Sequence, residues 1–411
     1  MTDSREERGA ILGKVDLLVR TKFFDLNFNG RNWPALMEQH RTSIIEAASS
    51  EEFEQNMVAL LKELGTSHTG FFRRESKIAS RNSVNATFRE RETDEGTRWA
   101  FQDVQPGGPA ANAGIKPGDI LLSIGQQEVI PPRPPEFRMG ASAQITVVQR
   151  NGTRRVTNVE LQVPKAKYRE CPYAEPRAVS ARKLTPDLGL LKVTMFPGVV
   201  GIDFARDVDR AVREIQDCDR LIVDLRGNPG GGIGGLRLMG YLTPDRLPVG
   251  YSLTRKRAEK GYRKEDLPQF RGIPAQKWRL PFLLLRFAGR DQSIVVVTEG
   301  LGKQKFHGRI ALLVNEHTSG AGEMVAGFAK ENKLAKIVGT KTAGRLLGGE
   351  GFKVGGGYMA FLPVGCYLSW GGHRFEGNGI MPDVEVDWSL ESSLDGSDNQ
   401  LNRAVEVANS L

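Results

Sequence analysis

Apolar residues recur every three or four positions in the first part of the chain, which is the spacing of helices that bury one face. Residues 7–24 follow this pattern with Ile11, Leu12, Val15, Leu18, Val19 and Phe23. The same kind of spacing predicts two further helices, over 32–48 and 50–64. Residues 1–70 are therefore predicted to form a small N-terminal helical domain.

The pattern changes to short strand-like runs from about residue 84. Residues 107–129, GGPAANAGIKPGDILLSIGQQEV, predict a short helix, a turn and then a strand over 120–124. This succession resembles the signature of the PDZ family, and the resemblance implies a PDZ domain over residues 84–163. Such domains bind an extended peptide by adding it to a sheet edge. The candidate for the ligand side is the segment with Trp99, Ala100 and Phe101.

From residue 186 onward, strand and helix patterns alternate. Two mostly apolar runs, 220–225 and 310–314, are predicted to be strands buried on both faces, as in a parallel sheet. Each run enters a glycine-rich turn that begins a helix, and ligands bind outside the carboxyl ends of such strands. We therefore predict an α/β core over 164–411. Within it, residues 244–306 are basic, aromatic and irregular, which suggests an insertion or strap.

The composition fits a globular protein. Apolar residues make up 39% and charged residues 26% of the chain, and no apolar run is long enough to span a membrane. The first residues, MTDSREERGAILGK, lack the apolar core of a secretory signal. These features predict a cytoplasmic protein without membrane insertion. The three cysteines, Cys171, Cys218 and Cys366, lie far apart with no CxxC pair, so no disulfide framework is expected.

The net charge is 57 − 49 = +8. The basic residues are dispersed and are not interleaved with aromatic residues, so nucleic-acid binding is not expected. The densest basic run is Arg255–Arg263, which leaves open an acidic partner near residues 254–264. No His, Cys, Asp or Glu spacing matches a zinc site, so neither a metal nor another cofactor is expected.

The two glycine-rich turns carry the candidate chemistry. The first, DLRGNPGGG (224–232), lacks the Lys-Ser/Thr pair of a phosphate-binding loop. Its glycines would instead expose backbone N–H groups that can form an oxyanion hole. The second, NEHTSGAGEM (315–324), has the small residues of a nucleophile elbow. By position, Gly230 is the first candidate donor, Gly231 its alternate and Ala321 the second donor. The other interpretation is that these residues only shape the turns.

Three strings, DLRGNPGG, NEHTSGAGEMVAGFAKENKLAKIVGTKTAG and EGNGIMPD, lie behind the PDZ signature. Together they resemble the C-terminal-processing, or tail-specific, protease family, which includes the tricorn core protease. The resemblance covers almost the whole chain. It implies an α/β fold with a ClpP/crotonase-like core, an N-terminal helical domain and an inserted PDZ domain. It also implies serine peptidase activity on polypeptides.

In that family the nucleophilic serine lies three residues before the acidic residue of the elbow helix. Counting back from Glu323 gives Gly320, which has no side chain and cannot attack a carbonyl. Ser319 precedes it directly. Three interpretations follow: the position was substituted to give an inactive enzyme, Ser319 acts as the nucleophile instead, or the protein is a natural non-peptidase that keeps the fold.

The resemblance also names candidate bases. One branch of the family uses a lysine where this chain has Arg345, and an arginine stays protonated and cannot serve as a base. The tricorn-like branch uses a histidine with a preceding serine and a distant glutamate, which correspond here to His68, Ser67 and Glu376. An unperturbed imidazole, with a pKa of about 6.5, suits proton transfer at neutral pH. His317, beside the elbow, is either a second base or a loop residue.

The leading prediction is a serine endopeptidase of the tail-specific class, with a polypeptide as its substrate. The alternative is a catalytically inactive protein that binds peptides or other ligands on the protease fold. A weaker third interpretation is an esterase or amidase that acts on small molecules. Whether the chain forms a homo-oligomer is left open.

Overall fold

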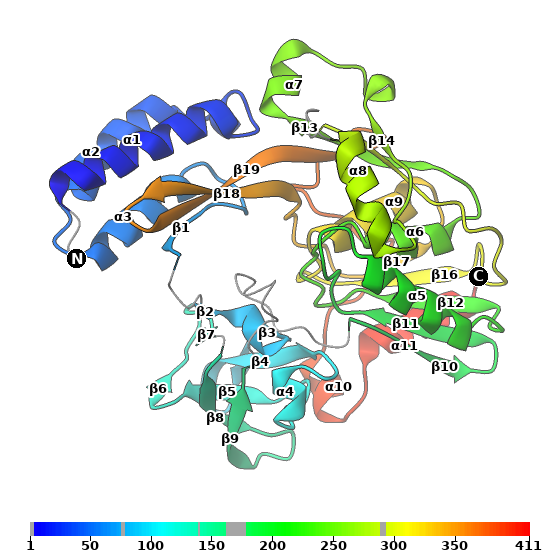
Figure 1. Cartoon of the computed structure of the whole chain (residues 1–411). Coiled ribbons are helices and arrows are strands. Elements are labelled where there is room, and N and C mark those ends of the chain that lie inside the picture. Colours follow the sequence, from blue (N-terminus) through cyan, green and yellow to red (C-terminus); the bar gives the residue numbers. More distant parts are fainter. Residues whose placement is uncertain (1–3, 75–78, 139, 162–177, 288–292) are drawn as a thin grey trace. The chain divides into compact units, whose positions relative to one another are not determined.

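The computed structural model describes residues 4–74, 79–138, 140–161, 178–287 and 293–411. The chain forms two compact units, and Figure 1 labels their elements. The first unit comprises Met1–Ser76, Arg246–Glu299 and Gly344–Gly379. The second comprises Lys77–Asp245, Gly300–Ala343 and Ile380–Leu411. Cys171 and the predicted boundary between residues 163 and 164 lie outside the described residues, so the predicted domain limits stay predictions.

Three helices open the first unit, as their apolar spacing predicts. They are α1 (Arg5–Lys22), α2 (Trp33–Ile45) and α3 (Ser50–Lys62). The start of α3 is fixed by Ser49, whose Oγ accepts the N–H of Glu52 at 3.1 Å, while Glu52 Oε2 accepts the N–H of Ala48 at 2.7 Å. These bonds satisfy N–H groups that a helix terminus leaves without partners.

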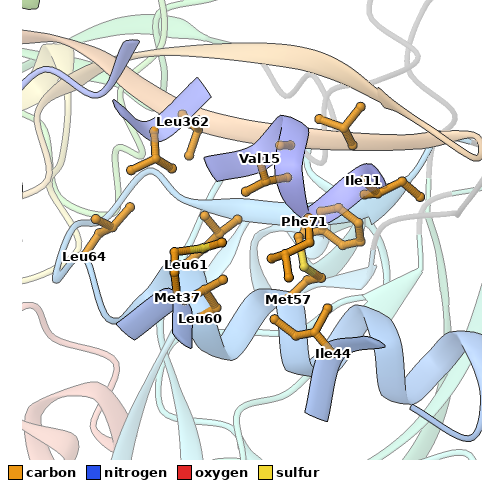
Figure 2. Close-up of a cluster of buried hydrophobic side chains, with 14 of the residues drawn as sticks. Ile11, Val15, Met37, Ile44, Met57, Leu60, Leu61, Leu64, Phe71 and Leu362 are labelled. Atoms are coloured by element: carbon orange, nitrogen blue, oxygen red, sulfur yellow. The ribbon is translucent and has the colours of Figure 1, made fainter. Parts of the chain in front are cut away.

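The buried faces of these helices pack on a sheet of the same unit. Figure 2 shows the cluster, in which Ile11 and Val15 of α1 and Met57 of α3 lie together with Phe71 and Leu362 from the strands. All five side chains are buried or nearly so. Fully burying a side chain of this size contributes roughly 1.5–3 kcal/mol relative to leaving it exposed. The cluster therefore anchors the loop that follows α3.

The sheet of the first unit has six strands in the order β1-β19-β13-β15-β14, with β18 also paired to β19. Their bounds are β1 (Gly70–Arg73), β13 (Pro248–Thr254), β14 (Gln269–Phe270), β15 (Val295–Val297), β18 (Leu347–Gly355) and β19 (Tyr358–Ser369). Three of these strands come from residues 244–306, so the prediction that this segment is irregular was wrong. It adds strands to a sheet, and Arg255 ties it to the N-terminal region by donating to the carbonyls of Phe23 and Asp25. The segment also holds α7 (Arg255–Lys260) and α8 (Leu280–Phe287).

The second unit begins with a sheet in the order β3-β4-β5-β8-β9, with β6 paired to β5. The bounds are β3 (Ala86–Thr93), β4 (Gly96–Val104), α4 (Pro109–Asn112), β5 (Ile120–Ile124), β6 (Gln127–Glu128), β8 (Ser142–Val148) and β9 (Arg154–Glu160). A separate two-stranded pair joins β2 (Ala79–Ser80) to β7 (Phe137–Arg138). The short helix, turn and strand predicted from residues 107–129 are confirmed.

The prediction that Trp99, Ala100 and Phe101 lie at a free, ligand-binding edge of the sheet needs correction. These residues lie on β4, which pairs with β3 on one side and with β5 on the other. Trp99 lies opposite Glu90 and Leu121, so both sides of its backbone face a neighbouring strand. A strand with two neighbours has no free edge for an added peptide. The alternation of the sequence did not reveal that this strand is central.

The core sheet of the second unit runs β10-β11-β12-β16-β17-β20. All neighbours are parallel except β10 and β11. The strand bounds are β10 (Val179–Thr185), β11 (Leu188–Val193), β12 (Arg220–Asp224), β16 (Ile310–Val314), β17 (Lys336–Gly339) and β20 (Val384–Glu385). The apolar runs at 220–225 and 310–314 are adjacent parallel strands, so the glycine-rich turns that follow them leave the same edge of the sheet.

Among the described residues, four helices accompany this sheet: α5 (Ile202–Glu214), α6 (Gly235–Leu242), α9 (Ala321–Glu331) and α11 (Asn399–Asn409). The short α10 (Leu390–Leu394) packs instead with Leu390 against Ala100 and Ile120 of the preceding sheet. Ala404, Val407 and Ala408 of α11 pack in one cluster with Ile222 and Leu313 of the sheet. Parallel sheets are covered on their faces in this way. The predicted mixed α/β fold with N-terminal helices is confirmed. None of the described helices is long and apolar enough to cross a membrane.

Candidate functional site

In the first unit, Ser67, His68 and Glu376 form a hydrogen-bonded chain. The loop between α3 and β1 carries the first two residues, and Glu376 follows β19. Ser67 donates to both oxygens of Glu376, from its N–H to Oε1 at 2.7 Å and from its Oγ to Oε2 at 2.9 Å. Ser67 Oγ lies 2.6 Å from Nδ1 of His68. Because the Ser67 hydroxyl proton points to the carboxylate, the arrangement favours the proton of His68 on Nδ1 and leaves the Nε2 lone pair available.

Burial lowers the pKa of His68, the carboxylate of Glu376 raises it, and the guanidinium of Arg345 lowers it again, with a net decrease below the usual value. The imidazole is therefore neutral at neutral pH, as a general base must be. Arg345 acts on the histidine through its positive charge.

In the second unit, the turn after β16 has the backbone of a nucleophile elbow. Gly320 is the N-cap of α9, with φ 56° and ψ −123°. Such a positive φ favours glycine, and the nucleophile of an elbow sits on a strained turn of this kind. A Cβ at position 320 would lie 3.3 Å from the Cα of Gly230 and 3.9 Å from the N of Gly231. A side chain at 320 would thus lie against the other glycine-rich turn. Ser319 is not among the residues with positive φ.

The two turns are bonded to each other. Thr318 Oγ1 donates to the carbonyl of Leu225 at 2.8 Å, and the N–H of Ser319 donates to the carbonyl of Asn228 at 2.9 Å. Glu323 accepts the N–H of Gly320 at 3.3 Å and the hydroxyl of Thr342 at 2.6 Å. The elbow is therefore held by residues other than the one at position 320.

The first candidate oxyanion donor needs correction. The N–H of Gly230 donates to Oδ1 of Asn228 at 2.8 Å, so it is already engaged. On either side of Gly231, the carbonyl of Gly230 accepts the N–H of Phe196, and the N–H of Gly232 donates to the carbonyl of Phe196. Within the described residues, the N–H of Gly231 itself has no acceptor. A Cβ at Gly231 would meet the carbonyl oxygen of Phe196 at 2.2 Å, so only glycine fits there. Of the two N–H groups, that of Gly231, the alternate, is thus the one left available.

Ala321 supplies the second available N–H. It is the first residue of α9, and the first N–H groups of a helix have no acceptor within the helix. Its N would lie 3.1 Å from a Cβ at Gly230. The N–H groups of Gly231 and Ala321 are therefore both near position 320. Two backbone donors in this arrangement can stabilise the negative oxygen of a tetrahedral intermediate.

The sequence did not reveal that residues 102–105, at the end of β4 and directly after it, bond to both turns. Nδ2 of Asn315 donates to Oδ2 of Asp103 at 2.8 Å, and its Oδ1 accepts the N–H of Gly227 at 3.0 Å. Gln105 donates to the carbonyl of Arg226 at 3.2 Å. His317 Nε2 lies 3.1 Å from Oε1 of Gln102, so this histidine is a partner of β4. Asn315 lies within the elbow motif, but the spacing of the sequence could not show that Asp103 is its partner.

Residues 187–386 match peptidase family S41, and residues 101–137 match the PDZ domain. The chain carries an S41 peptidase domain and a PDZ domain. The predicted family resemblance is thereby confirmed, including its serine-peptidase character at the level of the family.

Known relatives support the S41 assignment. The chain is 26% identical over 420 residues to "Putative tricorn protease homolog 2" of Streptomyces coelicolor, covering 95% of this chain and 31% of that protein. It is 24% identical over 401 residues to "Carboxyl-terminal-processing peptidase 3, chloroplastic" of Arabidopsis thaliana, covering 92% of this chain and 68% of that protein. The chain thus spans about a third of the length of the tricorn homolog.

Solved S41 structures share the fold. A "photosystem II D1 C-terminal processing protease" superposes with a TM-score of 0.57 at 18% identity, covering 92% of this chain and 93% of that one. A "putative S41 protease" from Bacteroides fragilis gives a TM-score of 0.57 at 16% identity, covering 97% of each chain. At these identities the likeness concerns the fold alone.

The second unit also contains a largely buried ionic cluster that the sequence did not reveal. Arg226 donates to both oxygens of Asp224 and to both oxygens of Asp398, the N-cap of α11. Lys192 lies 3.1 Å from Asp224. Burial raises the pKa of Asp224, but Arg226 and Lys192 outweigh it and hold the carboxyl well below its usual pKa. The cluster joins the start of the first glycine-rich turn to the last helix.

Proposed function

We propose that the protein is a serine peptidase scaffold of the tail-specific class, with a polypeptide as its substrate and position 320 as the site of the nucleophile. The observation that carries this proposal is the elbow backbone at Gly320, with the N–H groups of Gly231 and Ala321 beside it. The chain formed by Ser67, His68 and Glu376 supports it, because this is the arrangement that orients a histidine base.

The proposed reaction assigns one role to each group. A hydroxyl at position 320 attacks the carbonyl carbon of the scissile peptide, and its proton passes to Nε2 of His68. The negative oxygen that forms accepts the N–H groups of Gly231 and Ala321. His68 then protonates the leaving amine, which gives an acyl-enzyme ester, and water attacks this ester through the same base. Ser67 and Glu376 keep the ring of His68 oriented.

The proposal requires His68 to act on the residue at position 320, although the two belong to different units. The pairing rests on the family resemblance, in which a histidine with a preceding serine and a distant glutamate activates the nucleophile. The chain passes between the units at Ala343–Gly344 and at Gly379–Ile380, and Glu376 lies three residues before the second passage. In the second unit, the N–H of Ala343 donates to the carbonyl of Thr318, two residues before Gly320.

Gly320 favours a second candidate function. With no hydroxyl at the elbow, the protein would bind a polypeptide without cleaving it. Ser319 offers another nucleophile. It is partly exposed, and within the described residues its Oγ has no hydrogen bond, although its backbone lacks the positive φ of an elbow.

The deciding experiment compares the unchanged chain with Gly320→Ser, Gly320→Ala and Ser319→Ala, using a fluorophosphonate label and unfolded casein. We expect Gly320→Ser to be labelled and to cleave casein at least about a thousandfold faster than the unchanged chain. Gly320→Ala is the matched control, since it adds the same Cβ on the same backbone without a hydroxyl.

The other possible outcomes distinguish between the remaining functions. Labelling of the unchanged chain that Ser319→Ala abolishes would make Ser319 the nucleophile. A folded Gly320→Ser variant that is neither labelled nor active would overturn the peptidase proposal and leave the binding function. Labelling without casein cleavage would indicate hydrolysis of small molecules.

A further inference from the structure

A short helical stretch in the first unit exposes large apolar side chains. It runs through Lys277–Arg279 and continues as α8, Leu280–Phe287 (Figure 1). Trp278, Phe282 and Leu285 expose 61%, 65% and 71% of their surfaces. Their spacing of four and three residues places them on one face of a helix. The rings of Trp278 and Phe282 meet edge to face at 6.3 Å, which agrees with that placement.

The surrounding segment holds most of the net charge of the chain. Residues 255–287 contain ten Lys or Arg and three Asp or Glu, so their charge is 10 − 3 = +7, against +8 for the whole protein. Between Leu267 and Phe287 there are four basic residues and no acidic one. Arg279 lies 5.2 Å from the ring of Trp278, so the basic and apolar groups are adjacent. The rest of the chain is close to neutral.

This combination restricts the kind of partner. A helix with Trp, Phe and Leu on one face and basic residues beside them is typical of segments that lie in the interface of a bilayer. Anionic headgroups attract the basic residues, while the apolar face leaves water for the acyl boundary. A second copy of the chain is disfavoured, because a two-fold contact through this face would place two strongly positive segments against each other.

We propose that α8 and its basic flanks, residues 255–287, form a docking surface for membranes that contain anionic lipid. The contact is peripheral, because the apolar face formed by Trp278, Phe282 and Leu285 enters only the headgroup region. This proposal is independent of the peptidase proposal, because it involves neither the elbow nor the His68 chain. A substrate or effector at a membrane surface would be brought close to the protein by such a contact.

The test is cosedimentation of the full chain with phosphatidylcholine vesicles that either contain or lack phosphatidylserine. We expect binding only with phosphatidylserine, and a decrease as salt increases, because salt screens the basic segment. Replacing Trp278, Phe282 and Leu285 together by Gln is expected to abolish binding. Replacing Lys277 and Arg279 by Gln is expected to weaken it about fivefold for each charge removed.

Matched controls come from elsewhere on the surface. Leu17, Val156 and Val199 expose 61%, 59% and 84% of their surfaces, and replacing them together by Gln should leave vesicle binding unchanged. Lys22 and Lys62 are exposed basic residues for the matching charge control. Thermal unfolding of every variant should match the unchanged chain, since the replaced groups face solvent.

The proposal is overturned if the unchanged chain fails to bind phosphatidylserine vesicles, or if the Trp278, Phe282 and Leu285 replacement binds as well as its control. It is also overturned if sedimentation velocity shows that the chain self-associates through this face and that the same replacement only makes it monomeric. Equal binding to both kinds of vesicle would remove the role of the basic flanks and contradict the proposal in its stated form.

Discussion

The His68 chain and the Gly320 elbow differ in what carries their chemistry. Around His68, the chemistry depends on side chains, because the hydroxyl of Ser67 and the carboxylate of Glu376 orient the ring. At the elbow, it depends on the backbone, through the torsion angles of Gly320 and the N–H groups beside it. The elbow keeps its shape without a nucleophile because Thr318, Asn228 and Glu323 hold it. Catalysis and stability should therefore respond to different residues.

The largest effect is expected at His68. In the Gly320→Ser background, His68→Ala should reduce casein cleavage by about 10²–10⁴, the usual contribution of a general base. Its thermal unfolding should barely change, because the ring is partly exposed. Steady-state kinetics and a melting curve on the same samples test both statements. Undiminished cleavage would show that another group is the base.

Replacing Arg226 should have the opposite effect and should mainly lower the free energy of unfolding. Arg226→Ala leaves Asp224 buried and two carboxylates without their shared partner, which should cost about 3–5 kcal/mol of unfolding free energy. Arg403→Ala is the control, because its pair with Glu406 is exposed and contributes little. Denaturant unfolding measures both, and equal losses in the two variants would contradict the role of the cluster.

The same cluster predicts a pH dependence. The folded pKa of Asp224 lies below its unfolded value, so its stabilising contribution is present above about pH 4 and decreases as the pH falls below that value. Unfolding free energies at several acidic pH values should show this decrease in the unchanged chain. The decrease should be smaller in Arg226→Ala, in which the shift is reduced.

Asn315 should affect both properties moderately, because it joins β4 to both turns. Asn315→Ala leaves Asp103 and the N–H of Gly227 without this partner, at a cost of about 1–3 kcal/mol. In the Gly320→Ser background, kcat should fall while KM changes little, since the turn that carries Gly231 is loosened. Asn158→Ala, at an exposed position of the same unit, is the control. A loss of stability without a loss of kcat would limit Asn315 to a structural role.

The smallest effect concerns the pH profile of the Gly320→Ser variant. Burial lowers the pKa of His68 and the charge of Glu376 partly raises it again. A base must be neutral, so activity should persist below pH 6.5 and be lost only as the pH falls through the lowered pKa. Glu376→Gln removes the raising contribution and should move this limb to slightly lower pH. A shift to higher pH would contradict the assignment of Glu376 as the neighbouring charge.

Much of the fold could be predicted from the sequence. The apolar spacing of the N-terminal helices, the buried strands 220–225 and 310–314, and the turns after them depend on local preferences and on simple periodicity. The family resemblance also named Ser67, His68 and Glu376 as one set before any contact was known. Residues 244–306 were misjudged, because short strands in an irregular basic segment give no periodic signal.

The linear order of residues, with its spacing of apolar and small side chains, sufficed to determine the N-terminal helices, the two buried parallel strands of the core and the absence of a hydroxyl at position 320. Only the tertiary structure decided that β4 is a central strand, that Asn228 engages the N–H of Gly230 and leaves that of Gly231 available, and that Asp103 and Asn315 are partners. The physical reason is that strand neighbours and hydrogen-bond partners depend on the path of the folded backbone. Asp103 and Asn315 meet across 212 positions, and even Asn228 and Gly230, only two residues apart, are paired by the shape of the turn and not by a periodic pattern.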